Sequence, residues 1–273
     1  MIVTVLGSGS EGNATLVQSD GWSLLVDAGF SGRDLERRMR AVGVEPARLA
    51  GILVTHDHGD HTRGMGVLAR RFDLPLWLTR RTADACTAML TGREDVRDYG
   101  SSRAFRIGPL EVVPFLTVHD AADPVAVTVR DVVSGCKMGV ATDLGRPTAA
   151  VRAALAGCHV LVLEANHDDA LLWNGPYPWS VKQRIASSHG HLSNRAAAEL
   201  ARELMHPGLV AVTLAHLSRH CNDSGLARRA VERVLDRKGF RGRLEVAAQD
   251  EPGEPMDVAA LRRHAAPEQL TLL

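Results

Sequence analysis

Short apolar runs, bounded by glycine, proline and polar residues, alternate along the chain with stretches in which apolar residues recur at helical spacing. Leu35, Met39 and Val42 share one helical face, and Ser31 is suited to cap that helix. Further helices are predicted over 62–72, 81–90, 147–156, 195–205 and 224–238, with strands such as 51–54, 74–78, 160–163, 209–215 and 243–247 between them. This alternation predicts an α/β fold whose sheets are covered by helices.

A dense group of potential metal ligands follows the apolar run 51–54. His56, His58, Asp60 and His61 have the spacing H-x-H-x-D-H. The two histidines at 56 and 58 can turn their rings toward one ion, while the residues past the bend can reach a second ion. The alternative is a polar loop whose histidines only cover the end of a strand.

Three other apolar runs end in a residue of the same kind. His119 follows the run 111–118, Asp143 follows 136–142, and His216 follows 209–215. In sheets covered by helices, sites assemble at the carboxyl ends of the strands. A single histidine there would be ordinary, but the repetition predicts that these side chains share one edge.

In number, type and order, these ligands resemble those of the metallo-β-lactamase fold. The resemblance implies an αββα sandwich, with two mixed sheets flanked by helices, and two divalent metal ions, Zn²⁺ or Mn²⁺. It implies that one ion takes His56, His58 and His119, that the other takes Asp60, His61 and His216, and that Asp143 bridges both.

Asp27 ends the apolar run 22–26, where the resembling fold has an aspartate. From its position alone, Asp27 could orient a ligand histidine or begin a turn. The resemblance favours the first role.

A second histidine-rich stretch precedes the predicted helix 195–205. His189, His191 and Ser193 form a His-x-His-x-Ser run, in which Ser193 or Asn194 would cap the helix and leave free amides for an anion. Plain capping beside two incidental histidines is the alternative. The run resembles the phosphate-binding motif of β-CASP nucleases.

The domain organisation follows from the spacing of these motifs. Only 47 residues separate Asp143 from His191, too few for an inserted β-CASP domain. We therefore expect one metallo-β-lactamase domain over residues 1–249 and a flexible C-terminal tail over 250–273, where Pro, Gly and Glu are frequent.

Composition narrows the class of protein. The hydrophobic content of 45% is enough for a large core, and 32 basic residues balance 32 acidic ones, which excludes an overtly basic protein but allows a local positive groove. Four scattered cysteines give no disulfide scaffold. The start of the chain lacks a signal peptide, and no apolar run approaches the ~18 residues of a membrane span, so we expect a cytoplasmic protein without membrane contact.

Five loops together resemble those of the bacterial YycJ/WalJ family over residues 1 to about 248: 7–13, 119–124, 164–168, 190–194 and 215–218. The resemblance implies a 5′ to 3′ exonuclease acting on DNA in mismatch repair or replication. Asp60 and Asp143 would position the attacking water, and His191 would bind phosphate or protonate the leaving oxygen. An RNA-processing nuclease and a small-molecule ester or thioester hydrolase are the alternatives. Tyr177, in a turn-rich loop, is a candidate for base stacking.

The end of the chain carries a possible partner motif. Gln269, Leu270, Leu272 and Leu273 resemble the Q-L-x-L-F peptide by which bacterial repair proteins bind the sliding clamp. Docking of these leucines on the protein's own surface or on a second copy is the alternative.

Overall fold

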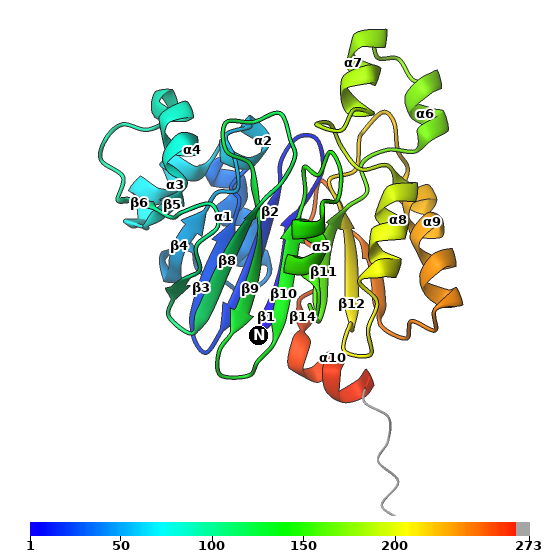
Figure 1. The fold of residues 1–273 in the computed structure, drawn as a ribbon. Coiled ribbons are helices and arrows are strands. Elements are labelled where there is room, and N and C mark those ends of the chain that lie inside the picture. The colour runs from blue at the N-terminus through cyan, green and yellow to red at the C-terminus, as the bar shows by residue number, and fades with distance from the viewer. Residues whose placement is uncertain (266–273) are drawn as a thin grey trace, which may run out of the picture.

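The chain folds as two mixed seven-stranded sheets packed face to face, as a computed structural model that describes residues 1–265 shows (Figure 1). The first sheet has the order β14 (Met256–Asp257), β1 (Ile2–Gly7), β2 (Ala14–Ser19), β3 (Trp22–Val26), β4 (Leu49–Leu53), β5 (Leu76–Leu78) and β6 (Val96–Asp98). The second has the order β13 (Arg243–Val246), β12 (Ala211–Ala215), β11 (Val160–Glu164), β10 (Lys137–Ala141), β9 (Val125–Asp131), β8 (Leu110–Leu116) and β7 (Phe105–Ile107).

The helices are α1 (Gly32–Ala41), α2 (Gly59–Thr62), α3 (Met65–Phe72), α4 (Arg80–Ala85), α5 (Ala149–Leu155), α6 (Asp169–Asn174), α7 (Trp179–Ile185), α8 (Asn194–Glu203), α9 (Ser224–Arg237) and α10 (Val258–Ala265), with 3₁₀ turns at Pro46–Arg48 and Thr87–Met89. Helices such as α1, α3, α8 and α9 cover the outer faces of the sheets, whereas α6 and α7 stand above the upper edge and α10 lies at the lower end (Figure 1). Leu35 and Met39 of α1 are fully buried against the first sheet, and Leu200 of α8 and Val231 of α9 lie in the core against the second. The predicted αββα sandwich is confirmed.

The layer between the sheets follows the two-residue period of the strands. Val3 and Val5 of β1 face Val127 and Val129 of β9 across this layer, and all four side chains are buried. Burial of this kind stabilises the fold by about 1.5–3 kcal/mol for each large apolar side chain.

The predicted helix boundaries hold for most elements. Ser31 caps α1 by accepting a hydrogen bond from the amide of Asp34. The helix expected over 62–72 begins instead at Met65, as α3, after the short helix α2. Gly64 between them packs closely, since a side chain there would lie 2.3 Å from the carbonyl oxygen of Phe30.

The prediction of a flexible tail from residue 250 is wrong for residues 250–265. Met256 pairs with Val3, and the amide of Gly253 donates to the carbonyl oxygen of Val5. Met256 and Val258 are buried, so β14 extends the first sheet and belongs to the domain. The predicted motif from Gln269 to Leu273 lies outside the described residues.

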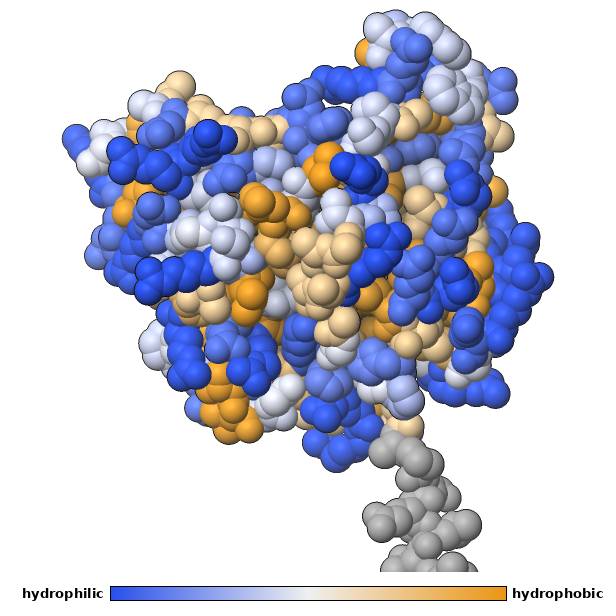
Figure 2. Space-filling model, in the orientation of Figure 1, coloured by the Kyte–Doolittle hydropathy of each residue, from blue (hydrophilic) through white to orange (hydrophobic). Residues whose placement is uncertain are grey.

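The strands β4, β8, β10 and β12 deliver their carboxyl ends to one edge of the sandwich, the upper edge in Figure 1. Residues 144–190 fold as α5, β11, α6 and α7 and contain no inserted domain. Figure 2 shows that the α6–α7 hairpin stands above the neighbouring surface, which dips between it and α4. Within residues 1–265, no helix has both the length and the apolar character needed to cross a membrane.

Candidate metal centre

All seven predicted ligands lie together at the upper edge of the sandwich. Their nitrogen and oxygen atoms form four overlapping groups, and within each group the atoms lie within 4.8 Å of one another. The groups are His56, His58 and His119; Asp60, His61 and His216; His56, His61 and Asp143; and Asp143, Glu164, His191 and His216. The first two groups match the predicted ligand sets of the two ions. Asp143 is a member of both remaining groups.

Unusual backbone conformations turn the side chains into this cluster. Asp27, Asp143 and His216 each follow a strand and have φ angles of 62°, 57° and 55°, in the left-handed region that most residues avoid. Such strain persists where the surrounding structure imposes it, and it concentrates at functional sites. A side chain at Gly29 would lie 1.6 Å from the carbonyl oxygen of Asp60, so only glycine permits the loops to approach this closely.

The cluster also contains polar atoms that the protein leaves unsatisfied. His56 Nε2 is buried and has no hydrogen-bond partner among the described residues, and buried Asp143 Oδ2 faces only the ring nitrogen Nε2 of His61, at 3.0 Å. Leaving such atoms unpaired costs roughly 1–3 kcal/mol each. Imidazole and carboxylate donors in this arrangement suit Zn²⁺, Mn²⁺ or Fe²⁺. The residues therefore fit a divalent cation.

Electrostatics supports the same assignment. Burial, together with the neighbouring His61, lowers the pKa of His56 well below its ordinary value, which keeps the ring neutral and able to bind metal. Burial opposes ionisation of Asp60 and Asp143, but the surrounding histidines hold the pKa of both carboxyls well below the usual range. The site thus keeps buried negative charge close to the neutral ring of His56.

Asp27 contacts a predicted ligand, as expected. Its Oδ2 lies 2.8 Å from Nδ1 of His61, and its Oδ1 accepts hydrogen bonds from the amide and hydroxyl of Thr55. His61 presents its other nitrogen to Asp143, with Nε2 at 3.0 Å from Oδ2. Burial alone would lower the pKa of His61, but Asp27, Asp143 and Asp60 raise it. Asp27 fixes the orientation of this ring.

The sequence predicts only that the polar run 164–168 contacts substrate or stabilises a turn, whereas the structure places Glu164, at the end of β11, within the donor cluster. Its Oε1 lies 2.8 Å from Nδ1 of His191 and 2.9 Å from Nδ1 of His216, while its Oε2 accepts from the amides of Leu144 and Leu192. Burial would raise its pKa, but His191 and His216 lower it to about 2. A charged residue closing the apolar run 160–163 was the available signal, and it is equally typical of a turn.

The loop 189–193 is only partly as predicted. His191 faces the cluster, and both His189 and His191 line the cavity above it. Ser193 caps α8, as predicted, with its hydroxyl accepting from the amide of Ala196. At the start of this helix the amide of Asn194 also donates within the protein, to the carbonyl oxygen of His167. These two helix amides are therefore not free for an anion, contrary to the prediction.

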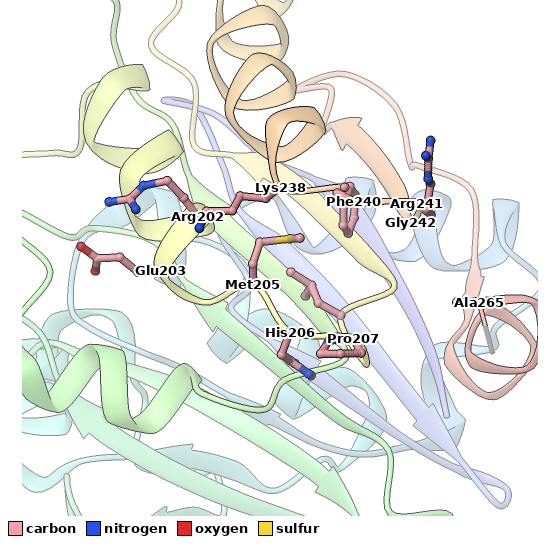
Figure 3. Close-up of a pocket in the computed structure, with 12 residues that line it drawn as sticks. Arg202, Glu203, Met205, His206, Pro207, Lys238, Phe240, Arg241, Gly242 and Ala265 are labelled. Carbon is pink, nitrogen blue, oxygen red and sulfur yellow. The ribbon is translucent and has the colours of Figure 1, made fainter. Parts of the chain in front are cut away.

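A cavity of about 290 Å³ opens above the cluster, with His58, His119 and His216 on its floor and Arg184 and His189 on its wall. A larger cavity, of about 720 Å³, lies at the start of β12, whereas the ligand His216 follows the end of the same strand (Figure 3). That cavity contains one histidine, His206, and one carboxylate, Glu203, and so lacks the set of metal donors.

Comparison with known proteins agrees with this geometry. Residues 23–213 match the family described as the beta-lactamase superfamily domain. The chain is 37% identical over 241 residues to exodeoxyribonuclease YycJ of Bacillus anthracis, covering 87% of this chain and 90% of that protein. It is 32% identical over 230 residues to exodeoxyribonuclease WalJ of Streptococcus pneumoniae, covering 82% and 84%.

Among solved structures, the metallo-beta-lactamase fold protein YhfI from Bacillus subtilis has the same fold. Its TM-score is 0.71 at 20% identity, with 93% of this chain and 99% of that one covered. Divalent-metal binding is a property of this fold, and the donor set found here agrees with it. The chain therefore belongs to the beta-lactamase superfamily and, within it, to the YycJ/WalJ family of metallo-β-lactamase-fold hydrolases.

Proposed function

We propose that this protein is a metal-dependent exodeoxyribonuclease that degrades DNA from the 5′ end, in mismatch repair or replication. The observation that carries the proposal is the complete donor cluster beside the His191–Glu164 pair, at the base of a cavity with a cationic wall. The relatives YycJ and WalJ, matched over most of their length, are named exodeoxyribonucleases. The 5′ to 3′ direction of degradation is taken from the resemblance to the YycJ/WalJ family described above.

In this proposal, two ions, Zn²⁺ or Mn²⁺, use the residues assigned from the sequence. One ion would be held by His56, His58 and His119, the other by Asp60, His61 and His216, and Asp143 would contact both. The chemistry that two such ions supply is the activation of a water at neutral pH and the stabilisation of charge on the phosphate.

The chain's own residues would then position the attacking water, the leaving oxygen and the substrate phosphate. Asp60 and Asp143 accept hydrogen bonds from the attacking water and direct it toward phosphorus. His191 keeps Nδ1 against Glu164, 2.8 Å away, which leaves Nε2 for the substrate. As a general acid the ring would donate its Nε2 proton to the leaving oxygen, and as a phosphate ligand it would donate the same N–H as a hydrogen bond to a phosphate oxygen. Arg184 and His189, on the cavity wall, would bind phosphate.

The test uses 5′-labelled and 3′-labelled DNA and RNA, with Mn²⁺, Zn²⁺ or a chelator. We expect mononucleotides to be released from the 5′ end of DNA, and release to stop with the chelator. Asp60→Ala should abolish hydrolysis while the circular dichroism spectrum is unchanged, since the residue lies outside the core. Preferential cleavage of RNA would favour the RNA-processing alternative, and turnover confined to esters or thioesters would favour the small-molecule one.

The C-terminal residues Gln269, Leu270, Leu272 and Leu273 add a proposed partner, the bacterial sliding clamp. This part of the proposal is supported by the sequence only. A short extended peptide that places leucines in a preformed apolar pocket binds weakly, but weak binding suffices when DNA holds both partners nearby. Deleting residues 269–273 should abolish clamp binding in calorimetry and leave hydrolysis of free DNA unchanged. A full-length protein that does not bind the clamp would refute it.

A further inference from the structure

The loop 7–13 between β1 and β2 reaches the metal centre, although it contains none of the predicted ligands. Three of its seven residues are glycines, and its polar side chains include Ser8 and Asn13, which are both buried. A buried polar side chain needs a partner inside the protein, because an unpaired one costs roughly 1–3 kcal/mol. The partners of Ser8 and Asn13 include residues on the loops that carry metal ligands.

The side chain of Asn13 contacts Asp60. Its nitrogen Nδ2 lies 3.2 Å from Oδ2 of Asp60 and 3.2 Å from Nε2 of His61, the two predicted ligands in α2. The same Nδ2 donates to the carbonyl oxygen of Gly9, whereas Oδ1 accepts from the amide of Gly9. Because these two backbone groups require opposite partners, they determine which end of the carboxamide faces Asp60. Asn13 therefore presents a hydrogen-bond donor to this carboxylate.

Ser8 links Asn13 to the loop that carries His216. Its hydroxyl donates to Oδ1 of Asn13, 2.7 Å away, and accepts from the backbone amide of His216, 2.8 Å away. His216 has a φ of 55°, a conformation that persists only where neighbouring groups impose it. A bridge of two buried side chains thus runs from His216 to Asp60, which belong to the same predicted ligand set.

Asp60 is the member of that set that most needs such a restraint. The side chains of His61 and His216 are 0% and 5% exposed, whereas that of Asp60 is 22% exposed and lines the cavity. Asp60 also lies in α2, a helix of only four residues. A carboxylate with room to rotate would lose that freedom on binding an ion, so orienting it in advance strengthens binding.

Gln249, near the end of the predicted domain, holds the same loop in place. Its side-chain oxygen accepts from the amide of Glu11 at 2.8 Å, and its side-chain nitrogen donates to the carbonyl oxygen of Gly12 at 3.0 Å. A side chain at Gly9 would lie 2.5 Å from the same oxygen, so the loop and Gln249 are in direct contact. The amides that donate within the protein are those of Ser8, Gly9, Glu11, Gly12 and Asn13. The loop therefore positions side chains rather than binding an anion through these amides.

We propose that Asn13 is a positioning residue that holds Asp60 in the orientation needed for metal binding, with Ser8 and Gln249 keeping Asn13 in place. The hydrogen bond from Nδ2 limits the rotation of the carboxylate. Asn13 lies outside the set of described residues that line the cavity, so its effect passes through Asp60 rather than through the substrate. The inference rests on the proposed metal-dependent nuclease function and adds residues outside its ligand set.

The experiment is a double-mutant cycle that measures Mn²⁺ binding to the metal-free protein by calorimetry. We expect Asn13→Ala to weaken Mn²⁺ binding by about 10–100-fold, the usual effect of removing a group that orients a ligand. In the Asp60→Ala background, where one predicted ligand is already lost, the same substitution should change the remaining affinity by less than about two-fold, because Asn13 acts through Asp60. An equal loss in both backgrounds, or unchanged affinity in Asn13→Ala, would overturn the proposal.

Two milder variants and a control separate positioning from loss of the fold. Ser8→Ala and Gln249→Ala leave Asn13 itself in place and should cause a smaller loss of Mn²⁺ affinity. Asp131→Ala removes a buried side chain that accepts hydrogen bonds in the turn before β10, at the end of that strand away from Asp143. This control should lower the free energy of unfolding in urea and leave Mn²⁺ binding unchanged. If Asn13→Ala does not fold, wild-type affinity in both milder variants would overturn the proposal.

Kinetics gives a readout that general destabilisation would not move. At saturating Mn²⁺, Asn13→Ala should lower kcat for bis-nitrophenyl phosphate, a small phosphodiester, and leave KM unchanged, because the effect passes through Asp60. A higher KM at unchanged kcat would mean that Asn13 contacts the substrate directly, contrary to the proposal.

Calorimetry also separates this proposal from the proposed function, because it measures metal binding without hydrolysis. Mn²⁺ affinity that depends on Asn13, in a protein that cleaves no DNA, would support the bridge and count against the nuclease. DNA cleavage by a protein whose Mn²⁺ affinity is independent of Asn13 would do the reverse.

Discussion

Replacing Glu164 with glutamine tests how the site is held together, since the substitution keeps the shape and removes one acceptor. Glu164 is fully buried, and both of its oxygens face donors. Oε2 accepts from the amides of Leu144 at 2.8 Å and Leu192 at 3.1 Å, and Oε1 faces Nδ1 of His191 and of His216. Glutamine offers one acceptor oxygen and one donor amide group, so it cannot satisfy both sides.

The two possible orientations of the glutamine have different costs. If its amide group faced the two backbone amides, two buried donors would lose their acceptor, at roughly 1–3 kcal/mol each. If it faced the histidines, both rings would have to accept at Nδ1 and carry their proton on Nε2. His216 would then lack the Nε2 lone pair, on the side that lies 3.1 Å from Asp60. We expect the second orientation, with a loss of about 10–100-fold in metal affinity or activity, the usual effect of removing a group that orients a ligand.

The assay measures metal content, hydrolysis of bis-nitrophenyl phosphate and the free energy of unfolding in urea. Glu111→Gln is the matched control, because Glu111 is partly exposed and pairs with Arg130 at the surface, where such pairs contribute at most about 1 kcal/mol. We expect Glu164→Gln to lose metal and activity while the control keeps both. Wild-type metal content and turnover in Glu164→Gln would refute the argument that Glu164 sets the tautomer of His216.

Three further predictions concern substitutions at His191 and Ser193, shortening of the chain, and the reactivity of Cys86. His191→Ala should lower turnover of DNA by about 100-fold or more, the usual contribution of a positioned acid or base, whereas Ser193→Ala should cost about 1 kcal/mol of stability through its cap on α8 and leave turnover of bis-nitrophenyl phosphate unchanged. Ending the chain after residue 249 should lower the melting temperature by removing β14 and its two buried apolar side chains, whereas ending it after residue 265 should leave these contacts intact, as differential scanning calorimetry can measure. Burial raises the pKa of the Cys86 thiol to about 11, and since the thiolate is the reactive form, the folded protein should react with Ellman's reagent at neutral pH only slowly at this position, and rapidly once unfolded in urea.

The fold and the seven donor residues could be predicted because each depends on patterns within short stretches of the sequence. The spacing of His56 to His61 is visible within six residues, and the remaining ligands each close an apolar run that reads as a strand. In a sheet covered by helices, the carboxyl ends of such strands meet at one edge. The residues that follow these strands in the sequence can therefore be expected to lie close together in space. The structure brings the residues together at that edge, and their assignment to two ions stays a prediction.

Contacts between distant segments could not be predicted in the same way. Glu164 gains its role only when His191 and His216 approach it from other elements, and on its own it is indistinguishable from a turn residue. The strand β14 forms because Met256 pairs with Val3 near the other end of the chain, whereas local composition there indicates a linker. Strand formation at a sheet edge depends on the partner strand more than on intrinsic preference.

The position of the site at the edge of two packed sheets explains how the fold tolerates so much buried charge. Four carboxylates, those of Asp27, Asp60, Asp143 and Glu164, are grouped with histidines where an apolar interior would oppose ionisation. The apolar cores end with residues such as Ala141 and Ala215, and the ligands Asp143 and His216 follow in the loops directly beyond them. The loops that follow each strand can hold strained backbones such as those at Asp143 and His216, because the strands beneath them are fixed on both sides.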